Sequence, residues 1–242
     1  MDIRGIEERA LNAWPALTTM VMDGWVLRLS RGYSKRANSL NALAPTTGID
    51  AALDGAEPIY RLARLRPIVR LSPLMPDGAD SALAARGYLA GDPTTVMTVG
   101  LDVRAGDPQV EIATVPTEAW ATGFAAANNV PAQHRDTHDR MLGGLRLPAG
   151  FATLHHDGRP IAYGLGVLER GLIGLFDIVT LPAARRQGAG RRLVMSLMAW
   201  GRARGATCAY LQVVDANAPA IALYHGLGFR PAYRYHYRLA PQ

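Results

Sequence analysis

Residues 180–193 read TLPAARRQGAGRRL, and this stretch decides the fold class. It follows an apolar run typical of a strand and opens an amphipathic run that predicts a helix from 188 to 204. Gly188 and Gly190 stand where the loop turns into that helix. Glycine accepts a positive φ and has no Cβ, so successive N–H groups can converge on an anion, helped by the helix dipole. The stretch therefore predicts a pyrophosphate-binding loop.

Two other kinds of nucleotide-binding loop, and a turn that binds no ligand, are the alternatives to this prediction. A dinucleotide-binding loop needs G-x-G-x-x-G, and here the third glycine position is Leu193. A P-loop needs a Gly-Lys pair, whereas Lys35, the only lysine, lies between Ser34 and Arg36. Taken alone, the stretch could still be a glycine-rich turn with an arginine-rich surface.

A second stretch, VVDANAPAIALYHGLGF at residues 213–229, supports the cofactor interpretation. With the Arg-x-x-Gly-x-Gly loop at 185–190, it resembles the GNAT superfamily of acetyl-coenzyme A (acetyl-CoA)-dependent N-acetyltransferases. The matching positions have the order and spacing usual in that superfamily and cover most of residues 110–240. They are the strand end Thr180-Leu181-Pro182, the loop Arg185 to Gly190, Asn217, Ala220, Tyr224 and Leu227-Gly228-Phe229.

The resemblance implies a GNAT fold and a site for acetyl-CoA between two splayed strands. Backbone groups of Ile178, Val179 and Thr180 would pair with the pantetheine arm, and one N–H there would polarise the thioester carbonyl. Asn217 would bond the same arm near the end of the second strand. The loop backbone would hold the pyrophosphate along Arg185, Arg186, Gln187, Gly188, Ala189, Gly190 and Arg191.

Tyr224 matches the usual general acid of the superfamily, in which the acetyl group passes directly to an amine without a covalent enzyme intermediate. A phenol of pKa about 10 can donate a proton or hydrogen bond to a sulfur of pKa about 8.5. Tyr224 follows Asn217 by two helical turns, so both could face one ligand. A core tyrosine packed beneath the sheet is the alternative.

Asp177 is the first candidate for the general base. Its carboxylate stands in the apolar run 175–179 that leads into the site, where it must be exposed or held by partners. Glu169 and the histidines stay open as alternatives. His134 and His138 are four residues apart on a predicted helix, but the Glu of H-E-x-x-H is missing, so we expect a solvated or substrate-facing pair and no metal site.

The order of elements predicts an α/β (α+β) fold with a mixed, largely antiparallel central sheet flanked by helices. Arg104-Ala105-Gly106-Asp107-Pro108 is the predicted linker, because glycine, aspartate and proline together break helices and strands. Both parts end in a helix, a strand, a short helix, a Gly-aromatic pair and a strand. We therefore predict a degenerate GNAT-like domain over 1–103, which has lost the front half of the repeat, and a catalytic GNAT domain over 109–242. Within the first part the pattern predicts helices over 10–22 and 49–65 and a strand over 24–29.

Residues 24–28 and 32–39 are similar to the N-terminal segment of bacterial two-part GNAT proteins, in which a degenerate first half packs on an active second half. The first part has no Arg-x-x-Gly-x-Gly loop, so we expect it to bind no cofactor. A second domain beside an open cleft commonly shapes a ligand site. Contacts to the acceptor are therefore expected from Trp25, Arg36, Asn38 or Ser39, and a purely structural role is the alternative.

The composition is that of a globular protein able to bury a core: 242 residues, 49% hydrophobic and 19% charged. The net charge of +6 comes from scattered arginines, which favours a basic surface over a nucleic-acid partner. Short apolar runs and an N-terminus without a signal peptide's apolar core predict a cytoplasmic protein with no membrane partner. A single cysteine, Cys208, excludes an intramolecular disulfide and a cysteine-rich zinc site, and we expect it to be buried and inert.

Two functions of different classes follow from the sequence. The first is an acetyl-CoA-dependent N-acetyltransferase that modifies the primary amine of a small molecule or peptide. The second is a non-catalytic acyl-CoA-binding sensor or assembly module with a GNAT fold. An intact loop, Asn217 and Tyr224 favour the enzyme, because a binder needs the loop but not the acid. The sequence also allows a homodimer.

Overall fold

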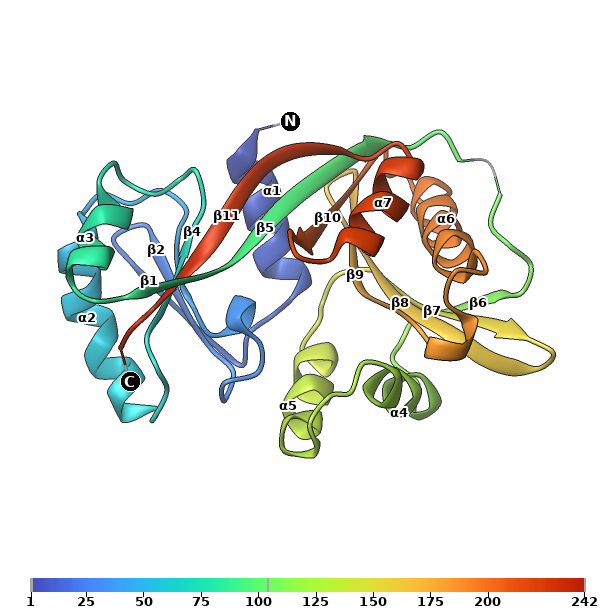
Figure 1. The fold of residues 1–242 in the computed structure, drawn as a ribbon, viewed down its shortest axis with the longest axis horizontal. Coiled ribbons are helices and arrows are strands. Elements are labelled where there is room, and N and C mark those ends of the chain that lie inside the picture. Colours follow the sequence, from blue (N-terminus) through green and yellow to red (C-terminus); the bar gives the residue numbers. More distant parts are fainter. Residues whose placement is uncertain (1, 104, 242) are drawn as a thin grey trace. The chain divides into compact units, whose positions relative to one another are not determined.

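The computed structural model of the chain describes residues 2–103 and 105–241 and forms two compact units (Figure 1). The first unit comprises Met1–Thr95, Val214–Ala216 and Ala232–Gln242, and the second comprises Val96–Val213 and Asn217–Pro231. These bounds differ from the predicted division into 1–103 and 109–242. The closing strand accounts for part of the difference, because its last residues pair with a strand of the first unit. Residues 96–103 account for another part, since they belong to the second unit. Arg104, where the predicted linker begins, lies outside the described residues.

The described residues of the first unit contain three α-helices, a short 3-10 helix and several strands or parts of strands. Its strand order begins β1-β2-β3-β4-β11, antiparallel except for the parallel pair β3 and β4. Helices α2 and α3 lie side by side (Figure 1). The elements are α1 (Ile3–Ala13), β1 (Thr18–Met22), β2 (Trp25–Leu29), the 3-10 helix η1 (Lys35–Ala37), β3 (Leu40–Ala42), α2 (Ile49–Leu62), β4 (Ile68–Leu71), α3 (Ala79–Ala85), the first residues of β5 (Leu89–Gly100) and the last of β11 (Arg230–Leu239).

The predicted helix over 10–22 is wrong. Helix α1 begins earlier, where the Asp2 side chain caps it by accepting from the Gly5 N–H at 2.5 Å, and it ends at Ala13, just before Pro15. Residues 18–22 form β1 instead, since β-branched side chains favour a strand. A tight turn at Asp23 and Gly24, both with positive φ, returns the chain into β2.

Strand alternation divides the buried side chains of the first unit between two faces. Trp25 and Leu27 pack into the core under α2 and α3, with Val69 of β4 on the same face. Arg70, the neighbour of Val69, points the other way and meets Glu7 of α1. One face of this sheet is therefore apolar, and the face under α1 holds a buried ion pair.

The second unit carries a sheet with the order β10-β9-β8-β7-β6, antiparallel except for the parallel pair β10 and β9. With the parallel pair in the first unit, this confirms the prediction of a mixed, largely antiparallel sheet flanked by helices. The elements are β6 (Val110–Ala113), α4 (Glu118–Ala127), α5 (Ala132–Gly143), β7 (Ala149–His156), β8 (Arg159–Glu169), β9 (Leu172–Thr180), the 3-10 helix η2 (Pro182–Ala184), α6 (Ala189–Arg202), β10 (Cys208–Val214) and α7 (Ala218–Gly226).

Helices α4 and α6 cover opposite faces of this sheet (Figure 1). Tyr163 of β8 packs against Gly123 of α4, whereas its neighbour Gly164 lies against Leu193 and Leu197 of α6. Because successive residues of a strand point to opposite faces, the two helices must lie on opposite sides. Helix α6 covers the main apolar core, which includes Leu193, Leu197 and Leu211.

The end of the predicted linker is tied to α6. The Asp107 N–H donates to Ser196 Oγ at 2.8 Å, and its carboxylate pairs with Arg192 at 2.6 Å. The Arg192 guanidinium lowers the pKa of that carboxyl. Within 2–103 and 105–241, no helix combines the length and apolarity that crossing a membrane requires.

The last elements of the two parts, which the sequence predicts to be a repeat, share a local structure. Gly87 and Gly228 both have positive φ. In each case the next residue donates its N–H five residues back, Tyr88 to the Leu83 carbonyl and Phe229 to the Tyr224 carbonyl, both at 3.0 Å. Glycine at this helix end is favoured because it adopts the left-handed conformation without a Cβ clash. That the first unit is a degenerate GNAT copy stays a prediction.

Candidate active site

The parallel ladder between β9 and β10 stops before either strand does. Its register runs from Cys208 opposite Leu172 to Leu211 opposite Leu175. β9 continues to Thr180 and β10 to Val214. The edge of β9 that faces β10 therefore extends beyond the ladder along Ile178, Val179 and Thr180, the residues predicted to pair with a pantetheine arm. On its other edge, β9 stays paired with β8, Val179 opposite Tyr163.

A β-bulge interrupts β9 at Asp177. The register passes from Tyr163 opposite Val179 to Leu165 opposite Phe176, so Asp177 and Ile178 together oppose Gly164. Asp177 has a φ of 51°. A Cβ on Gly164 would stand 2.7 Å from Ile178 Cδ1, so the glycine opposite the bulge leaves room for the Ile178 side chain. Bulges of this kind re-aim a side chain.

The bulge turns Asp177 toward helix α5. In regular alternation Asp177 would share a face with Leu175, which belongs to the core under α6. Instead, Asp177 Oδ2 lies 3.1 Å from His138 Nε2. The Asp177 side chain is 10% exposed. The sequence left two possibilities for this carboxylate, exposure or a partner that holds it. The structure shows that a partner, His138, holds it.

His138 is buried, so the expectation of a solvated or substrate-facing histidine pair is wrong for this residue. Its side chain is 0% exposed, and its ring stacks on Phe124 with centroids 5.1 Å apart. His134 stays half-buried on the same helix. The buried residues of α5 are Thr137, His138, Met141 and Leu142, a spacing that marks one helical face. That spacing was the available signal for a buried His138.

The predicted pyrophosphate loop joins β9 to the N-terminus of α6. Arg186 and Gly188 have positive φ, and Gly188 is the N-cap of α6. Residues 185–188 are exposed. Around Gly188, none of the described residues has a heavy atom within 4 Å of the place where a Cβ would stand. The first N–H groups of α6, which a helix leaves without intrahelical partners, begin at this glycine.

The loop lies against the strand end and helix α7. A Cβ on Gly190 would stand 3.2 Å from Leu223 Cδ2 and 3.5 Å from Thr180 Oγ1. Arg185 donates through Nε to the Thr180 carbonyl at 3.3 Å, and Arg191 donates to the Gly226 carbonyl at 3.0 Å. The structure thus brings the strand end, the loop and the helix of Tyr224 together. Gln187, also predicted in the loop, donates to the Ala183 carbonyl at 2.9 Å.

Tyr224 and Asn217 lie on α7 as predicted. Tyr224 is buried against Phe229, with ring centroids 5.8 Å apart. Burial raises the pKa of Tyr224 to about 12, so its phenol keeps its proton at neutral pH. Asn217 is the N-cap of α7 and accepts the Ala220 N–H at 3.3 Å through Oδ1. This leaves the two N–H groups of the Asn217 amide as donors toward a ligand.

The predicted acceptor contacts in the first unit occupy structural positions. Trp25 is 0% exposed and donates to Thr47. The Asn38 amide accepts from Ser30 and Gly32 and donates to Tyr33 and Ser34, which uses its full hydrogen-bonding capacity. Ser39 is 0% exposed beside Asn41. Arg36 is half-buried over the Trp14 ring at 5.6 Å. Trp25, Asn38 and Ser39 thus have packing and hydrogen-bonding partners within the first unit, and a contact with an acceptor stays a prediction.

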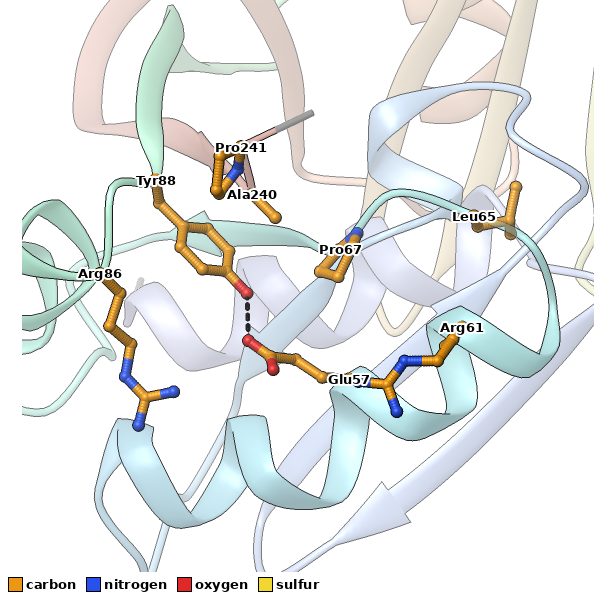
Figure 2. A pocket seen from close by; sticks show the side chains of 8 residues that line it. All are labelled: Glu57, Arg61, Leu65, Pro67, Arg86, Tyr88, Ala240 and Pro241. Atoms are coloured by element: carbon orange, nitrogen blue, oxygen red, sulfur yellow. Dashed lines mark hydrogen bonds between the residues drawn. The ribbon is translucent and has the colours of Figure 1, made fainter.

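A cavity of about 520 Å³ in the first unit contains none of the predicted site residues (Figure 2). Tyr88 donates to Glu57 Oε1 at 2.7 Å inside it, and the guanidinium groups of Arg61 and Arg86 flank this pair. Arg86 also pairs with Asp50 at 2.8 Å. The lining of the cavity therefore carries two guanidinium groups and one carboxylate.

The smallest change that tests the loop is Gly188→Ala. The left-handed conformation costs an L-residue about 1–2 kcal/mol, and the added methyl group stands where an anion would approach. We expect lower thermal stability and an acetyl-CoA Kd raised roughly tenfold or more, the value of one hydrogen bond to a charged group. Gly158→Ala is the matched control, since Gly158 also has positive φ and open space around its Cβ position but lies in the β7–β8 turn. Calorimetry should find the acetyl-CoA affinity of Gly158→Ala unchanged. Equal weakening of binding in both variants would contradict the assignment of this loop to the pyrophosphate.

The fold and this strand, loop and helix arrangement are those of the GNAT fold. The solved structure described as "GCN5-related N-acetyltransferase from Kribbella flavida" matches with a TM-score of 0.71, covering 100% of this chain and 97% of that one. The sequence identity is 18%, so this likeness shows the fold alone.

The family model described as "Probable histone acetyltransferase Rv0428c C-terminal" matches residues 1–238, and the chain belongs to this family of N-acetyltransferases. It is 29% identical over 244 residues to the "Uncharacterized N-acetyltransferase YobR" of Bacillus subtilis (strain 168), with 98% of both chains covered. It is also 29% identical over 244 residues to the "Probable histone acetyltransferase Rv0428c" of Mycobacterium tuberculosis (strain ATCC 25618 / H37Rv), covering 94% of this chain and 70% of that protein.

Proposed function

We propose that the protein transfers an acetyl group from acetyl-CoA directly to a primary amine of a small molecule or peptide, at the end of the β9–β10 ladder. The observation that carries this proposal is the ladder that stops at Leu175 and Leu211 while both strands continue, next to the N-terminus of α6. Acetyl-CoA supplies the activated thioester. The chain supplies the binding groups, a proton donor and a proton acceptor.

The residues present fit acetyl-CoA. Gly188 leaves open the space that a Cβ would occupy, and Arg186 adds exposed positive charge beside it. The backbone from Arg185 to Arg191 would hold the pyrophosphate, and the N–H and carbonyl groups of Ile178–Thr180 would pair with the pantetheine amides. Asn217 would donate through its amide N–H groups to the same arm. Arg192 is engaged with Asp107, so the other loop arginines provide the charge.

Two side chains move protons in this proposal. Asp177 accepts a proton from the acceptor ammonium, directly or through water, so that the amine can attack. Tyr224, whose pKa burial raises to about 12, holds its proton and donates toward the leaving sulfur. A histidine-held carboxylate and a buried neutral phenol are suited to these opposite tasks.

Asp177→Asn is expected to lower kcat by about 10²–10⁴-fold at neutral pH, the usual contribution of a general base. The amide can still accept from His138 but cannot take up a proton, so the fold should persist. The deficit should shrink toward pH 10, where an alkyl amine of pKa about 10 deprotonates in solution. Glu169→Gln is the control, because Glu169 is another carboxylate candidate for the base and pairs with Arg170. A pH–rate series with both variants would contradict the assignment if Glu169→Gln were the more impaired.

The proposed activity is tested by thiol release from acetyl-CoA against a panel of amines that includes polyamines, amino acids and lysine-containing peptides. Release that depends on both acetyl-CoA and one amine class supports the proposal and begins to identify the acceptor. Tight acetyl-CoA binding without thiol release from any of these amines would instead favour the non-catalytic acyl-CoA-binding module.

A further inference from the structure

We propose that His138 is the positioning residue of this site: its imidazole fixes the Asp177 carboxylate so that the free oxygen can accept the proton of the acceptor amine. The inference rests on the proposed function, in which Asp177 is the base. It concerns the step before attack on the thioester, where one N–H bond of the ammonium breaks and one O–H bond forms on Asp177. The imidazole exchanges no proton in this step.

The geometry of the pair is that of a buried, oriented hydrogen bond. His138 Nε2 and Asp177 Oδ2 are 3.1 Å apart and come from α5 and β9, 39 residues apart in the sequence. An ionised carboxylate only accepts, so the shared proton is on Nε2. One carboxylate oxygen is thus held, and Oδ1 is left for the amine or a bridging water.

The ring of His138 is fixed by packing as well. It stacks on Phe124 at an interplanar angle of 27°, and Phe124 in turn stacks on Trp120 with centroids 5.2 Å apart. Trp120 is anchored by its indole N–H, which donates to the Ala152 carbonyl at 3.0 Å. Rings locked in this way hold a hydrogen-bond donor in one place, which is what a positioned catalytic group requires.

The backbone of β9 is shaped for the same contact. Asp177 has a positive φ at the bulge, a conformation that aspartate adopts more readily than most residues other than glycine. Without the bulge the carboxylate would point toward α6, away from His138. The second ring nitrogen, Nδ1, lies 3.7 Å from the exposed Asp139. The bulge therefore directs the Asp177 carboxylate toward α5, and the buried histidine holds it there.

The test compares His138→Gln with His138→Asn in the full chain, using acetyl-CoA and the best amine of the panel. The glutamine amide nitrogen reaches about as far as Nε2, whereas asparagine stops at the position of Nδ1. We expect His138→Asn to lower kcat roughly 10- to 100-fold, the value of one hydrogen bond to a charged group. The KM for acetyl-CoA should stay within about twofold, and His138→Gln should recover most of the rate.

Two further variants separate positioning from packing. Met141→Ala removes buried apolar contact from the same face of α5 and keeps both His138 and Asp177, and it should lower stability but leave kcat within about threefold. In an Asp177→Asn background, His138→Asn should cost no further rate, because the base that it positions is already gone. Thermal unfolding and acetyl-CoA titration establish that each variant is folded.

Three results would overturn the inference: equal kcat in His138→Asn and His138→Gln, an additive loss in the Asp177→Asn background, or a kcat loss of the same size in Met141→Ala. The failure of the proposed function is distinct, since the wild-type chain would then release no thiol with any amine of the panel. If the wild-type chain is active and Asp177→Asn keeps its rate, Asp177 is not the base. If Asp177→Asn is impaired and His138→Asn is not, only the positioning role fails.

Discussion

Tyr224→Phe is expected to lower kcat by about 10²–10⁴-fold while leaving the Kd for acetyl-CoA within about twofold. The phenylalanine ring keeps the packing against Phe229, so the change removes only the hydroxyl. Without it, no phenol donates to the sulfur as negative charge develops there, and general-acid catalysis of this kind accounts for a loss of that size. Steady-state kinetics together with calorimetric titration separates the two quantities.

The control for this variant is Tyr163→Phe. Tyr163 is also a buried tyrosine of the second unit, but it packs against Gly123 of α4. Burial raises the pKa of Tyr224 to about 12, so its phenol stays protonated throughout pH 7–10 and the ratio of wild-type to variant kcat should be constant over that range. A Tyr224→Phe enzyme with wild-type kcat would remove Tyr224 from the mechanism.

Glu7→Ala is expected to destabilise the first unit by about 3–5 kcal/mol, because it leaves the Arg70 guanidinium buried without its partner. Both carboxylate oxygens of Glu7 accept from Arg70, one of them at 2.9 Å, and Oε1 also accepts from Tyr233 at 2.5 Å. The Glu7 side chain is 1% exposed and that of Arg70 is 3% exposed. For a chain of this size, the loss corresponds to a fall in Tm of roughly 10 °C.

Two further proteins test the Glu7 prediction, one as a control and one as a rescue. Glu8→Ala, one residue further along the same helix and half-buried, should change the free energy of unfolding by less than about 1 kcal/mol. The pair Glu7→Leu with Arg70→Met should restore most of the stability, since no buried charge is then left unpaired. Urea unfolding of the four proteins measures this directly, and an unchanged midpoint in Glu7→Ala would contradict it.

The sequence predicted most elements of the second unit because hydrophobic periodicity is a local property. The helix predicted over 188–204 is α6, and the strand that precedes its loop is β9. The sequence also predicted the closing strand, but it did not predict that the last residues of this strand belong to the first unit. The sequence shows that residues 232–239 alternate, whereas the partner β4 is specified only by packing and register across the fold.

The active-site geometry was predictable only in part. The glycines at 188 and 190 allowed the loop to be predicted, because both stand where a strand is followed by the start of a helix. The bulge at Asp177 was missed, since the residue that permits it, Gly164, lies on the neighbouring strand. His138 was missed because α5 is polar along most of its length, and the four residues of its buried face are outnumbered. The burial of Trp25, Asn38 and Ser39 was not predictable, because a sequence does not distinguish a buried residue with satisfied hydrogen bonds from one that faces a ligand.

The most direct test of the central claim is a calorimetric titration of the full chain with acetyl-CoA. One site per chain is predicted, because the glycine loop and the strands that extend beyond their ladder occur in the second unit and the first part lacks such a loop. A stoichiometry of one, with the affinity lowered in Gly188→Ala and unchanged in Gly158→Ala, is the expected result. Absence of binding, or binding that both variants weaken equally, would contradict the assignment of the cofactor to this site.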